Sequence, residues 1–233
     1  AYFLTKSVSI EEDFIENFLL PDHFDGLPHG MLPMCYPADP KSFIPQWPMW
    51  LILQVDEYRR VRHGARPFEN EFKSRFMEFI NYFEPYFNKE GLLESLPGWN
   101  CIEWSKANDY LDGVHFQTNL LFAKCLEIVA GWCNARQYAE KAAAIRGATR
   151  SLAFDGHCLY DNAIRGPDGT LKTTRNASES AQCFALLFDL LPADSPQRAR
   201  LEDAILSGRH PACREAPVNM FVGRLLRLEL GRG

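Results

Sequence analysis

Apolar residues recur every three or four positions along most of the chain, which is the spacing of an amphipathic helix. This period predicts helices over 9–20, 48–63, 67–87, 116–132, 135–152, 176–191, 195–206 and 218–230. Ser9 with Glu12, and Asn176 with Glu179, have the spacing of capping pairs at two predicted helix starts. The pattern therefore indicates a mainly helical protein.

The segments 116–132 and 135–152 form the clearest pair of predicted helices. The first is apolar nearly all round, whereas the second is rich in Ala and carries Arg, Lys and Glu on one face. So few residues join them that the two helices must run antiparallel and lie side by side. We therefore expect the first to be an inner helix and the second an outer one.

Three segments lack the helical spacing of apolar residues: two long loops and a predicted hairpin. Residues 21–45 form a loop rich in Pro, Gly, Asp and His, but with enough apolar residues to pack over a cleft. Residues 88–114 form a second long loop. Partial alternation around a Gly-Pro-Asp-Gly turn predicts a small β-hairpin near 157–174.

The order of these elements indicates helices in pairs, joined by connections that are alternately short and long. That asymmetry is typical of a barrel of helical hairpins with a cleft at the end where the long loops lie. A helical bundle is the simpler alternative, and the lack of a fixed repeat length argues against a solenoid.

Composition excludes some classes of partner. The chain has 233 residues, of which 46% are hydrophobic and 24% charged, as in an ordinary globular domain. A net charge of −5 argues against a nucleic-acid-binding surface, which needs a basic patch. The sequence has no apolar run of the length needed to cross a bilayer, so no membrane partner is expected.

Seven cysteines are scattered along the chain without a CxxC pair. An odd number with no metal-ligand spacing favours buried thiols and a reducing compartment, and neither a disulfide framework nor a zinc site. The six histidines show no ligand spacing, so we expect no metal or cofactor. Residues 1–4 resemble the end of a helix already under way, which predicts that the sequence is a fragment. Compartment and oligomeric state stay open.

Residues 97–110 combine two Trp, a Tyr, two acids and two amides in a segment without helical periodicity. The C–H face of a sugar ring stacks on an indole, and its hydroxyls need hydrogen-bond donors and acceptors. The segment therefore suits carbohydrate binding. A loop of buried aromatic residues with satisfied polar partners has the same composition.

Four groups of residues, in order along nearly the whole chain, resemble bacterial α-L-rhamnosidase-like proteins of glycoside hydrolase family 78. They are Gly-Met-Leu-Pro-Met-Cys-Tyr-Pro at 30–37, Phe-Ile-Pro-Gln-Trp at 43–47, Ile-Glu-Trp-Ser-Lys-Ala-Asn at 102–108, and Thr-Arg-Asn at 174–176. The resemblance implies an all-α fold, namely part of a six-hairpin (α/α) barrel with long loops. Residues 1–233 would then be a single domain, a fragment of the catalytic domain.

The resemblance also implies inverting hydrolysis of terminal α-L-rhamnosyl or related residues by two carboxylic acids. In the family, the acid precedes the first of these stretches and the base lies in a Trp-Glu motif after the last helix. We find neither motif, so the catalytic residues are unassigned and the segment is expected to supply subsite walls and to be inactive alone. The alternative is a non-catalytic carbohydrate-binding or helical scaffold domain.

Trp47 and Trp104 are the leading candidates for sugar platforms, and packing in the core is the alternative for both. We call residues 97–110 the central loop. Glu103 stands where many family members carry Asp before the Trp of this loop. Its carboxylate either binds a substrate hydroxyl or holds a loop by accepting backbone N–H groups.

Four further residues complete the predicted substrate-binding set. Asn108 and Tyr36 are included by the same argument from polar and aromatic side chains within the resembling stretches. Arg175 and Glu179 precede or open a predicted helix, where capping and a local ion pair explain them at least as well as substrate contact.

Overall fold

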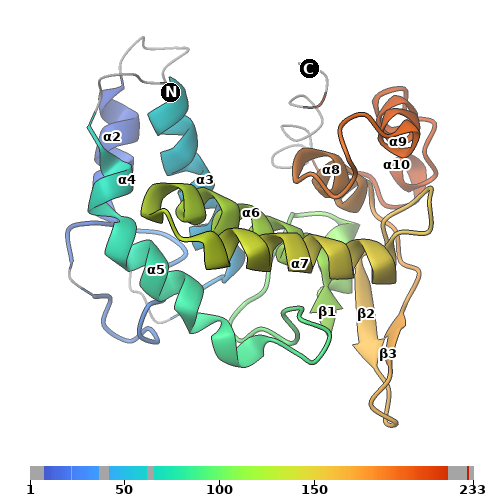
Figure 1. Cartoon of the computed structure of the whole chain (residues 1–233), viewed down its shortest axis with the longest axis horizontal. Coiled ribbons are helices and arrows are strands. Elements are labelled where there is room, and N and C mark those ends of the chain that lie inside the picture. The colour runs from blue at the N-terminus through green and yellow to red at the C-terminus, as the bar shows by residue number, and fades with distance from the viewer. Residues whose placement is uncertain (1–7, 22, 37–41, 62–65, 220–229, 231–233) are drawn as a thin grey trace.

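The computed structural model describes residues 8–21, 23–36, 42–61, 66–219 and 230, and it is mainly helical (Figure 1). Its α-helices are α2 (Ser9–Asn17), α3 (Gln46–Val61), α4 (Phe68–Glu71), α5 (Lys73–Tyr82), α6 (Phe116–Cys133), α7 (Arg136–Ala153), α8 (Glu179–Leu187), α9 (Pro196–Leu206) and α10 (Ala212–Glu215). Two short 3-10 helices, η1 (Glu84–Tyr86) and η2 (Lys106–Tyr110), lie in the loops. The predicted all-α class is confirmed. The helix expected at 218–230 lies almost entirely outside the described residues.

The predicted helix at 67–87 is divided into α4, α5 and η1. Its stripe of phenylalanines nevertheless faces inward across each break, because five rings are fully buried. These are Phe68, Phe72, Phe76, Phe79 and Phe83. The rings of Phe72 and Phe76 stack with their centroids 4.6 Å apart. Burial of this aromatic face stabilises the segment, although its backbone is not one continuous helix.

Both predicted capping pairs are wrong. Val8 occupies the N-cap position of α2 and supplies no side-chain cap, so Ser9 is already the first helical residue. The N-cap of α8 is Ser178, whose Oγ accepts a hydrogen bond from the backbone N–H of Ala181 at 3.1 Å. Asn176 lies two residues too early for that role.

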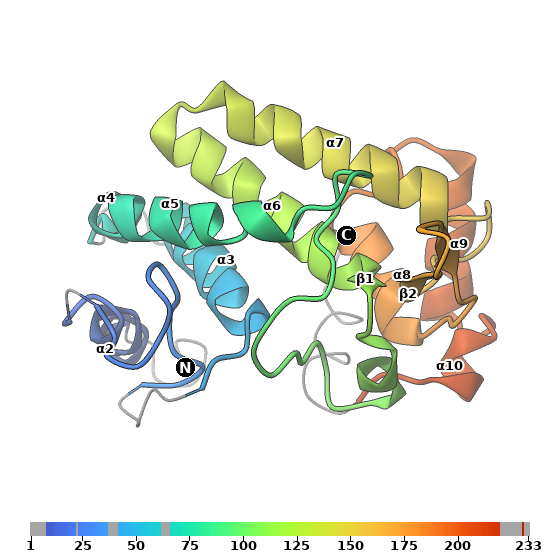
Figure 2. The ribbon, with the colours of Figure 1, turned by 90° about the horizontal axis from the view of Figure 1, so that it is seen from below.

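The predicted inner and outer helices are confirmed in α6 and α7. Most residues of α6 are buried, whereas α7 buries only one face. Asn134, between them, adopts a left-handed conformation with φ 51° and ends α6. Helix α6 packs against α3, α5, α7 and α8, and Figure 2 shows it running between α3 on one side and α8 on the other.

The predicted hairpin is part of a three-stranded antiparallel sheet in the order β1-β2-β3. It consists of β2 (Asn162–Arg165) and β3 (Leu171–Thr173), and the two-residue strand β1 (Val114–His115) was not predicted. Val114 pairs with Ala163. Gly113 has φ +70°, and a Cβ there would lie 2.4 Å from the carbonyl oxygen of Ala163, so only glycine fits.

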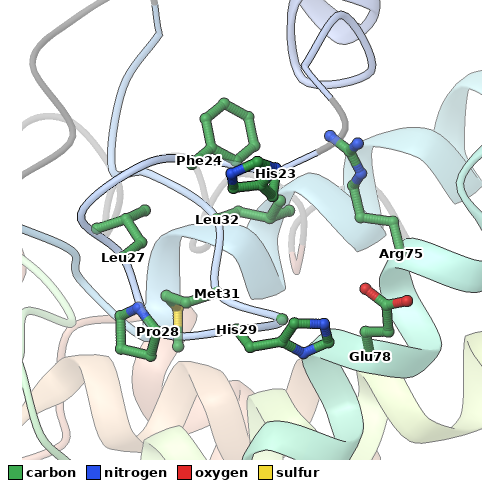
Figure 3. A pocket seen from close by; sticks show the side chains of 10 residues that line it. His23, Phe24, Leu27, Pro28, His29, Met31, Leu32, Arg75 and Glu78 are labelled. Carbon is green, nitrogen blue, oxygen red and sulfur yellow. The ribbon is translucent and has the colours of Figure 1, made fainter.

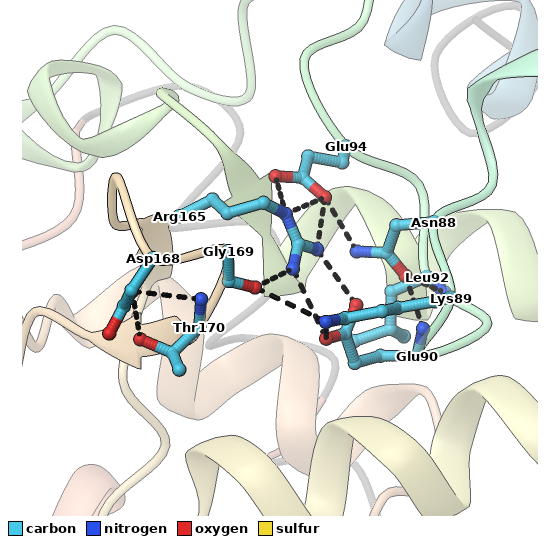
Figure 4. A network of polar contacts seen from close by, with 9 residues as sticks. All are labelled: Asn88, Lys89, Glu90, Leu92, Glu94, Arg165, Asp168, Gly169 and Thr170. Carbon is cyan, nitrogen blue, oxygen red and sulfur yellow. Dashed lines mark hydrogen bonds and ion pairs between the residues drawn. The ribbon is translucent and has the colours of Figure 1, made fainter.

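An arginine fastens the hairpin to the loop after η1 (Figure 4). The Nη2 atom of Arg165 lies 2.7 Å from Glu90 Oε2 and 2.6 Å from Glu94 Oε2. Its Nη1 atom also donates to the carbonyl oxygen of Gly169, 2.9 Å away in the turn. Hydrogen bonding to the guanidinium holds the pKa of both carboxyls below the ordinary range.

The first turn of α6 carries three consecutive buried polar residues, Gln117, Thr118 and Asn119. Asn119 Oδ1 accepts from the backbone N–H of Leu93 at 2.8 Å, and Asn119 Nδ2 donates to the Leu93 carbonyl at 3.0 Å. One side chain therefore satisfies both backbone groups of a buried loop residue.

We expect Asn119→Ala to lower the free energy of unfolding by about 2–4 kcal/mol, because each buried backbone group left unpaired costs about 1–3 kcal/mol. Urea unfolding monitored by circular dichroism measures the change. Asn70→Ala, the same substitution at an exposed position of α4, is the control. Equal effects of the two substitutions would contradict the role assigned to Asn119.

Candidate functional site

Gln46, the first residue of α3, joins two helix starts to the central loop. Its Nε2 atom donates to Thr118 Oγ1 of α6 at 3.0 Å and to Asn100 Oδ1 at 2.9 Å. Its Oε1 atom accepts from the backbone N–H of Cys101 at 3.3 Å. Since Gln46 is 1% exposed, these bonds fix the loop over the N-terminal ends of α3 and α6.

Two indoles project from this fixed loop. The rings of Trp99 and Trp104 meet edge to face with their centroids 5.6 Å apart. They remain 48% and 53% exposed, so the sequence's aromatic segment is not simply a buried loop. Trp99 was not among the predicted site residues, although it belongs to the same segment. A second indole beside the first enlarges a surface on which a ring could stack.

Asn108 holds the loop through a hydrogen bond to its backbone. Its Oδ1 atom accepts from the backbone N–H of Ile102 at 3.0 Å. Ser105 caps η2, since its Oγ atom accepts from the backbone N–H of Ala107 at 3.2 Å. These two contacts determine the path of the chain on either side of Trp104.

The carboxylates of Glu103 and Glu179 are both buried, at 1% exposure, and they bind adjacent residues of one segment. Glu103 Oε1 accepts from the backbone N–H of Asn219, and its Oε2 accepts from Ser105 Oγ at 2.7 Å. Glu179 Oε2 accepts from the backbone N–H of Val218 at 3.0 Å. Of the two interpretations given for Glu103, the structure shows the contact that holds a loop.

Further bonds attach the segment 215–219 to the same surroundings. The backbone N–H of Glu179 donates to the carbonyl oxygen of Ala216 at 2.9 Å. The side chain of Asn219 donates to the carbonyl oxygen of Trp104. The segment therefore bridges the central loop and the start of α8, and it brings Glu103, Trp104 and Glu179 into one neighbourhood.

Trp47 lies one residue after Gln46 and is 38% exposed. With Trp50 and Gln54 it lines one side of a groove of about 190 Å³. The other lining residues are mainly apolar: Phe14, Phe18, Pro33, Met34, Pro48 and Leu51. The ring of Trp50 contacts Phe184 of α8 and Phe188, the residue that ends this helix, at centroid distances of 5.8 and 6.0 Å. These aromatic contacts join α3 to α8.

The remaining predicted residues lie outside these contacts. Tyr36 packs against Phe24 and Phe18 with centroids 5.5 and 6.4 Å apart, which is the packing of an aromatic cluster beside α2. Arg175 is exposed between β3 and α8, in a left-handed conformation with φ 66°. A role in sugar binding for either residue stays a prediction.

A buried polar network beside the site was not predicted. Asp161 Oδ1 lies 2.6 Å from both Gln117 Nε2 and Ser178 Oγ, and Oδ2 accepts from the backbone N–H of Ser178 at 2.6 Å. Burial raises the pKa of Asp161 to about 7. One sequence signal was present, since Asp161 lies in the segment of partial alternation, but nothing in that segment identified its partners.

His115 is a further buried titratable group near the site. Its Nδ1 atom lies 2.8 Å from Thr118 Oγ1 and accepts from the backbone N–H of Thr118 at 3.3 Å. Burial lowers the pKa of His115 to about 3, so the imidazole is neutral at physiological pH. It caps α6 and acts as a structural acceptor.

Neither a metal cluster nor a membrane-spanning helix is found in the part of the chain that the structure describes. There, no group of three or more His, Cys, Asp or Glu could hold a metal ion. No helix among these residues is both long and apolar enough to cross a bilayer. The described residues of the site offer exposed indole rings and hydrogen-bonding groups.

Several solved structures share this fold, among them two rhamnosidases. One is the rhamnosidase of glycoside hydrolase family 78 from Bacillus sp. GL1, with a TM-score of 0.69 and 21% identity over 84% of this chain and 20% of that chain. The other is a rhamnosidase from Klebsiella oxytoca with rhamnose bound, with a TM-score of 0.64 and 14% identity over 87% of this chain and 39% of that chain. Neither a family model nor a curated protein sequence matches the chain.

These comparisons establish the class of fold. The chain has the fold of part of a family 78 rhamnosidase, as the sequence resemblance predicted, and it spans less than half of either matched chain. At such identities the likeness concerns the fold alone. What the chain binds must be argued from the site.

The raised pKa of Asp161 predicts a pH-dependent stability. Its ordinary pKa is 3.8 and its folded pKa is about 7, so the folded state binds this proton more tightly than the unfolded chain. The stabilising contribution is complete below the unfolded pKa and is lost as the pH rises through the folded pKa. Each pKa unit corresponds to about 1.4 kcal/mol.

We therefore expect the free energy of unfolding of the unsubstituted chain, relative to Asp161→Asn, to fall between about pH 4 and about pH 8. Urea unfolding at several pH values measures this difference. The exposed Asp109→Asn should show no such trend. A constant difference for Asp161→Asn would show that the carboxyl is not titrating in this range.

We also expect Glu103→Gln to loosen the segment that it holds. Replacing a charged acceptor by an amide weakens the bond to the N–H of Asn219, so this amide should exchange with solvent about tenfold faster or more. Hydrogen exchange followed by NMR measures the rate. Glu57→Gln on the exposed face of α3 is the control. Unchanged exchange at Asn219 would refute the anchoring role.

Proposed function

We propose that the chain forms part of the carbohydrate-binding wall of a glycoside hydrolase that acts on terminal α-L-rhamnosyl or related residues. One observation carries the proposal. In a chain with a rhamnosidase fold, the exposed pair Trp99 and Trp104 lies on a loop fixed to the N-terminal ends of α3 and α6. Indole faces that are exposed and held in place suit the apolar face of a sugar ring.

In this proposal the predicted residues divide into two roles. Trp104, with Trp99, provides the stacking surface, and Trp47 contributes a further exposed indole at the start of α3. Glu103 and Asn108 act as positioning residues, because their oxygens bind backbone N–H groups that shape the loop. Because buried hydrogen bonds already fix this loop, its aromatic side chains lose little conformational entropy when they bind a ligand.

Hydrolysis with inversion requires an acid that protonates the leaving oxygen and a base that activates water. Glu103 and Glu179 are buried and each binds a backbone N–H, which does not suit either task. We therefore propose that a longer chain supplies this pair, and that residues 1–233 form a single domain, part of a six-hairpin α/α barrel. The small share of each rhamnosidase that the chain spans supports this view.

The engagement of both carboxylates favours one alternative, a carbohydrate-binding domain that does not catalyse. An assay of the full-length protein on an aryl α-L-rhamnoside separates the two functions. Release of the aryl group supports the hydrolase. Binding of the sugar without hydrolysis supports the alternative.

The binding surface can be tested on this chain directly. We expect L-rhamnose to change its tryptophan fluorescence saturably, and Trp104→Ala to weaken that binding about tenfold, since one stacking contact contributes about 1–2 kcal/mol. Because Trp104 is 53% exposed, the substitution should leave the fold intact.

Trp132→Phe is the control for this experiment. Trp132 stacks on Phe76 near the C-terminal end of α6, at the opposite end of that helix from the central loop. Its substitution should leave the affinity unchanged. Equal affinity of the Trp104→Ala variant and the unsubstituted chain would remove this indole from the binding site.

A further inference from the structure

A second cavity lies away from the indole pair, between the loop that follows α2 and the helix α5 (Figure 3). Its volume is about 300 Å³, at the lower end of the range of about 300–1,000 Å³ for ligand pockets. The long loop at 21–45 was predicted to pack over a cleft, and this cavity lies beneath part of it.

The walls of the cavity differ in chemistry. Apolar side chains form one part of the lining: Phe24, Leu27, Pro28, Met31 and Leu32. Polar side chains form the remainder, with His29 and Glu78 near each other at one end and His23 and Arg75 at the other, as Figure 3 shows. An apolar wall with a few polar groups at its edge is typical of small-molecule sites.

The loop is fixed against α5 at the edge of the cavity. Gly30 has φ +83°, and a Cβ there would lie 2.7 Å from the carbonyl oxygen of Glu78. Only glycine allows this close approach, which determines where the neighbouring His29 lies. The polar edge is therefore held in place before any ligand arrives.

Arg75 closes the other end. Its guanidinium donates to the carbonyl oxygens of Phe18 and Pro21, and it lies over the ring of Phe24 with 5.7 Å to the centroid. Both terminal nitrogens are thus used in holding the loop. His23 is paired with Asp25 at 2.8 Å.

His29 and Glu78 are different, because within the described part of the chain neither side chain makes a hydrogen bond or an ion pair. An imidazole and a carboxylate that line the same cavity offer both a donor and an acceptor. The lining carries one guanidinium and one carboxylate, at opposite ends, so neither sign of charge dominates it.

We propose that this cavity binds a neutral, hydroxyl-bearing ring of monosaccharide size. Its hydroxyls would bind His29 and Glu78, and its C–H face would lie on Leu27 and Pro28, which are less buried than the other apolar lining residues. This site is separate from the indole pair, and it does not require the proposed glycosidase activity.

The test is a titration of the isotope-labelled chain with L-rhamnose, followed by the backbone amide signals of Gly30 and Glu78. We expect these signals to shift saturably. The double substitution His29→Ala with Glu78→Ala should weaken the binding at these signals about tenfold, as expected for two lost hydrogen bonds. Both residues are exposed, and Glu57→Ala, outside the cavity, is the control.

Three outcomes would overturn the proposal. They are the absence of shifts at Gly30 and Glu78, equal binding by the double variant, and an equal response to glycerol or to inorganic phosphate in place of the sugar. Trp104→Ala separates the two sites, because it should weaken the binding seen by fluorescence about tenfold and leave these shifts intact. Shifts that disappear with Trp104→Ala would also contradict a second site.

Discussion

The first turn of α6 is the constraint on which the arrangement of the loops depends. An inner helix normally carries apolar side chains at such positions, but here Gln117, Thr118 and Asn119 are consecutive and buried. Each binds a different segment: the residues before β2, the start of α3 and the loop after η1. Because a buried polar group without a partner costs about 1–3 kcal/mol, these segments are held in register with the helix and with one another.

In this arrangement, the side chains that pack in the core differ from those that are exposed to solvent. Between the helices, aromatic rings fill the space, as Trp50 does against Phe184 and Phe188. At the N-terminal ends of α3 and α6, the central loop presents Trp99 and Trp104 to solvent. A loop that is fixed by its backbone can leave its large side chains free for a ligand, whereas a loop fixed by those side chains could not. The exposure of the two indoles is therefore a consequence of how the loop is held.

The periodicity of apolar residues was enough to predict most of the long helices, the inner and outer members of the α6–α7 pair, and the hairpin, but it missed the breaks within 67–87 and the short helix α10. Those features depend on many positions at once, so single errors matter little. Caps depend on one residue, and Ser178 caps α8 where Asn176 had been expected. The strand β1 was missed for a related reason, since two residues carry no measurable alternation and its formation depends on pairing with β2.

The site shows more clearly what a sequence cannot reveal. The types of residue in the central loop indicated carbohydrate, but the role of Glu103 depends on a partner 116 positions away. Its carboxylate and that of Glu179 bind adjacent backbone N–H groups, an arrangement that no local spacing encodes. An acid beside tryptophans is easily taken for a substrate-binding group. Here both acids are buried and hold backbone N–H groups of the segment 215–219, whereas the indoles of Trp99 and Trp104 remain exposed.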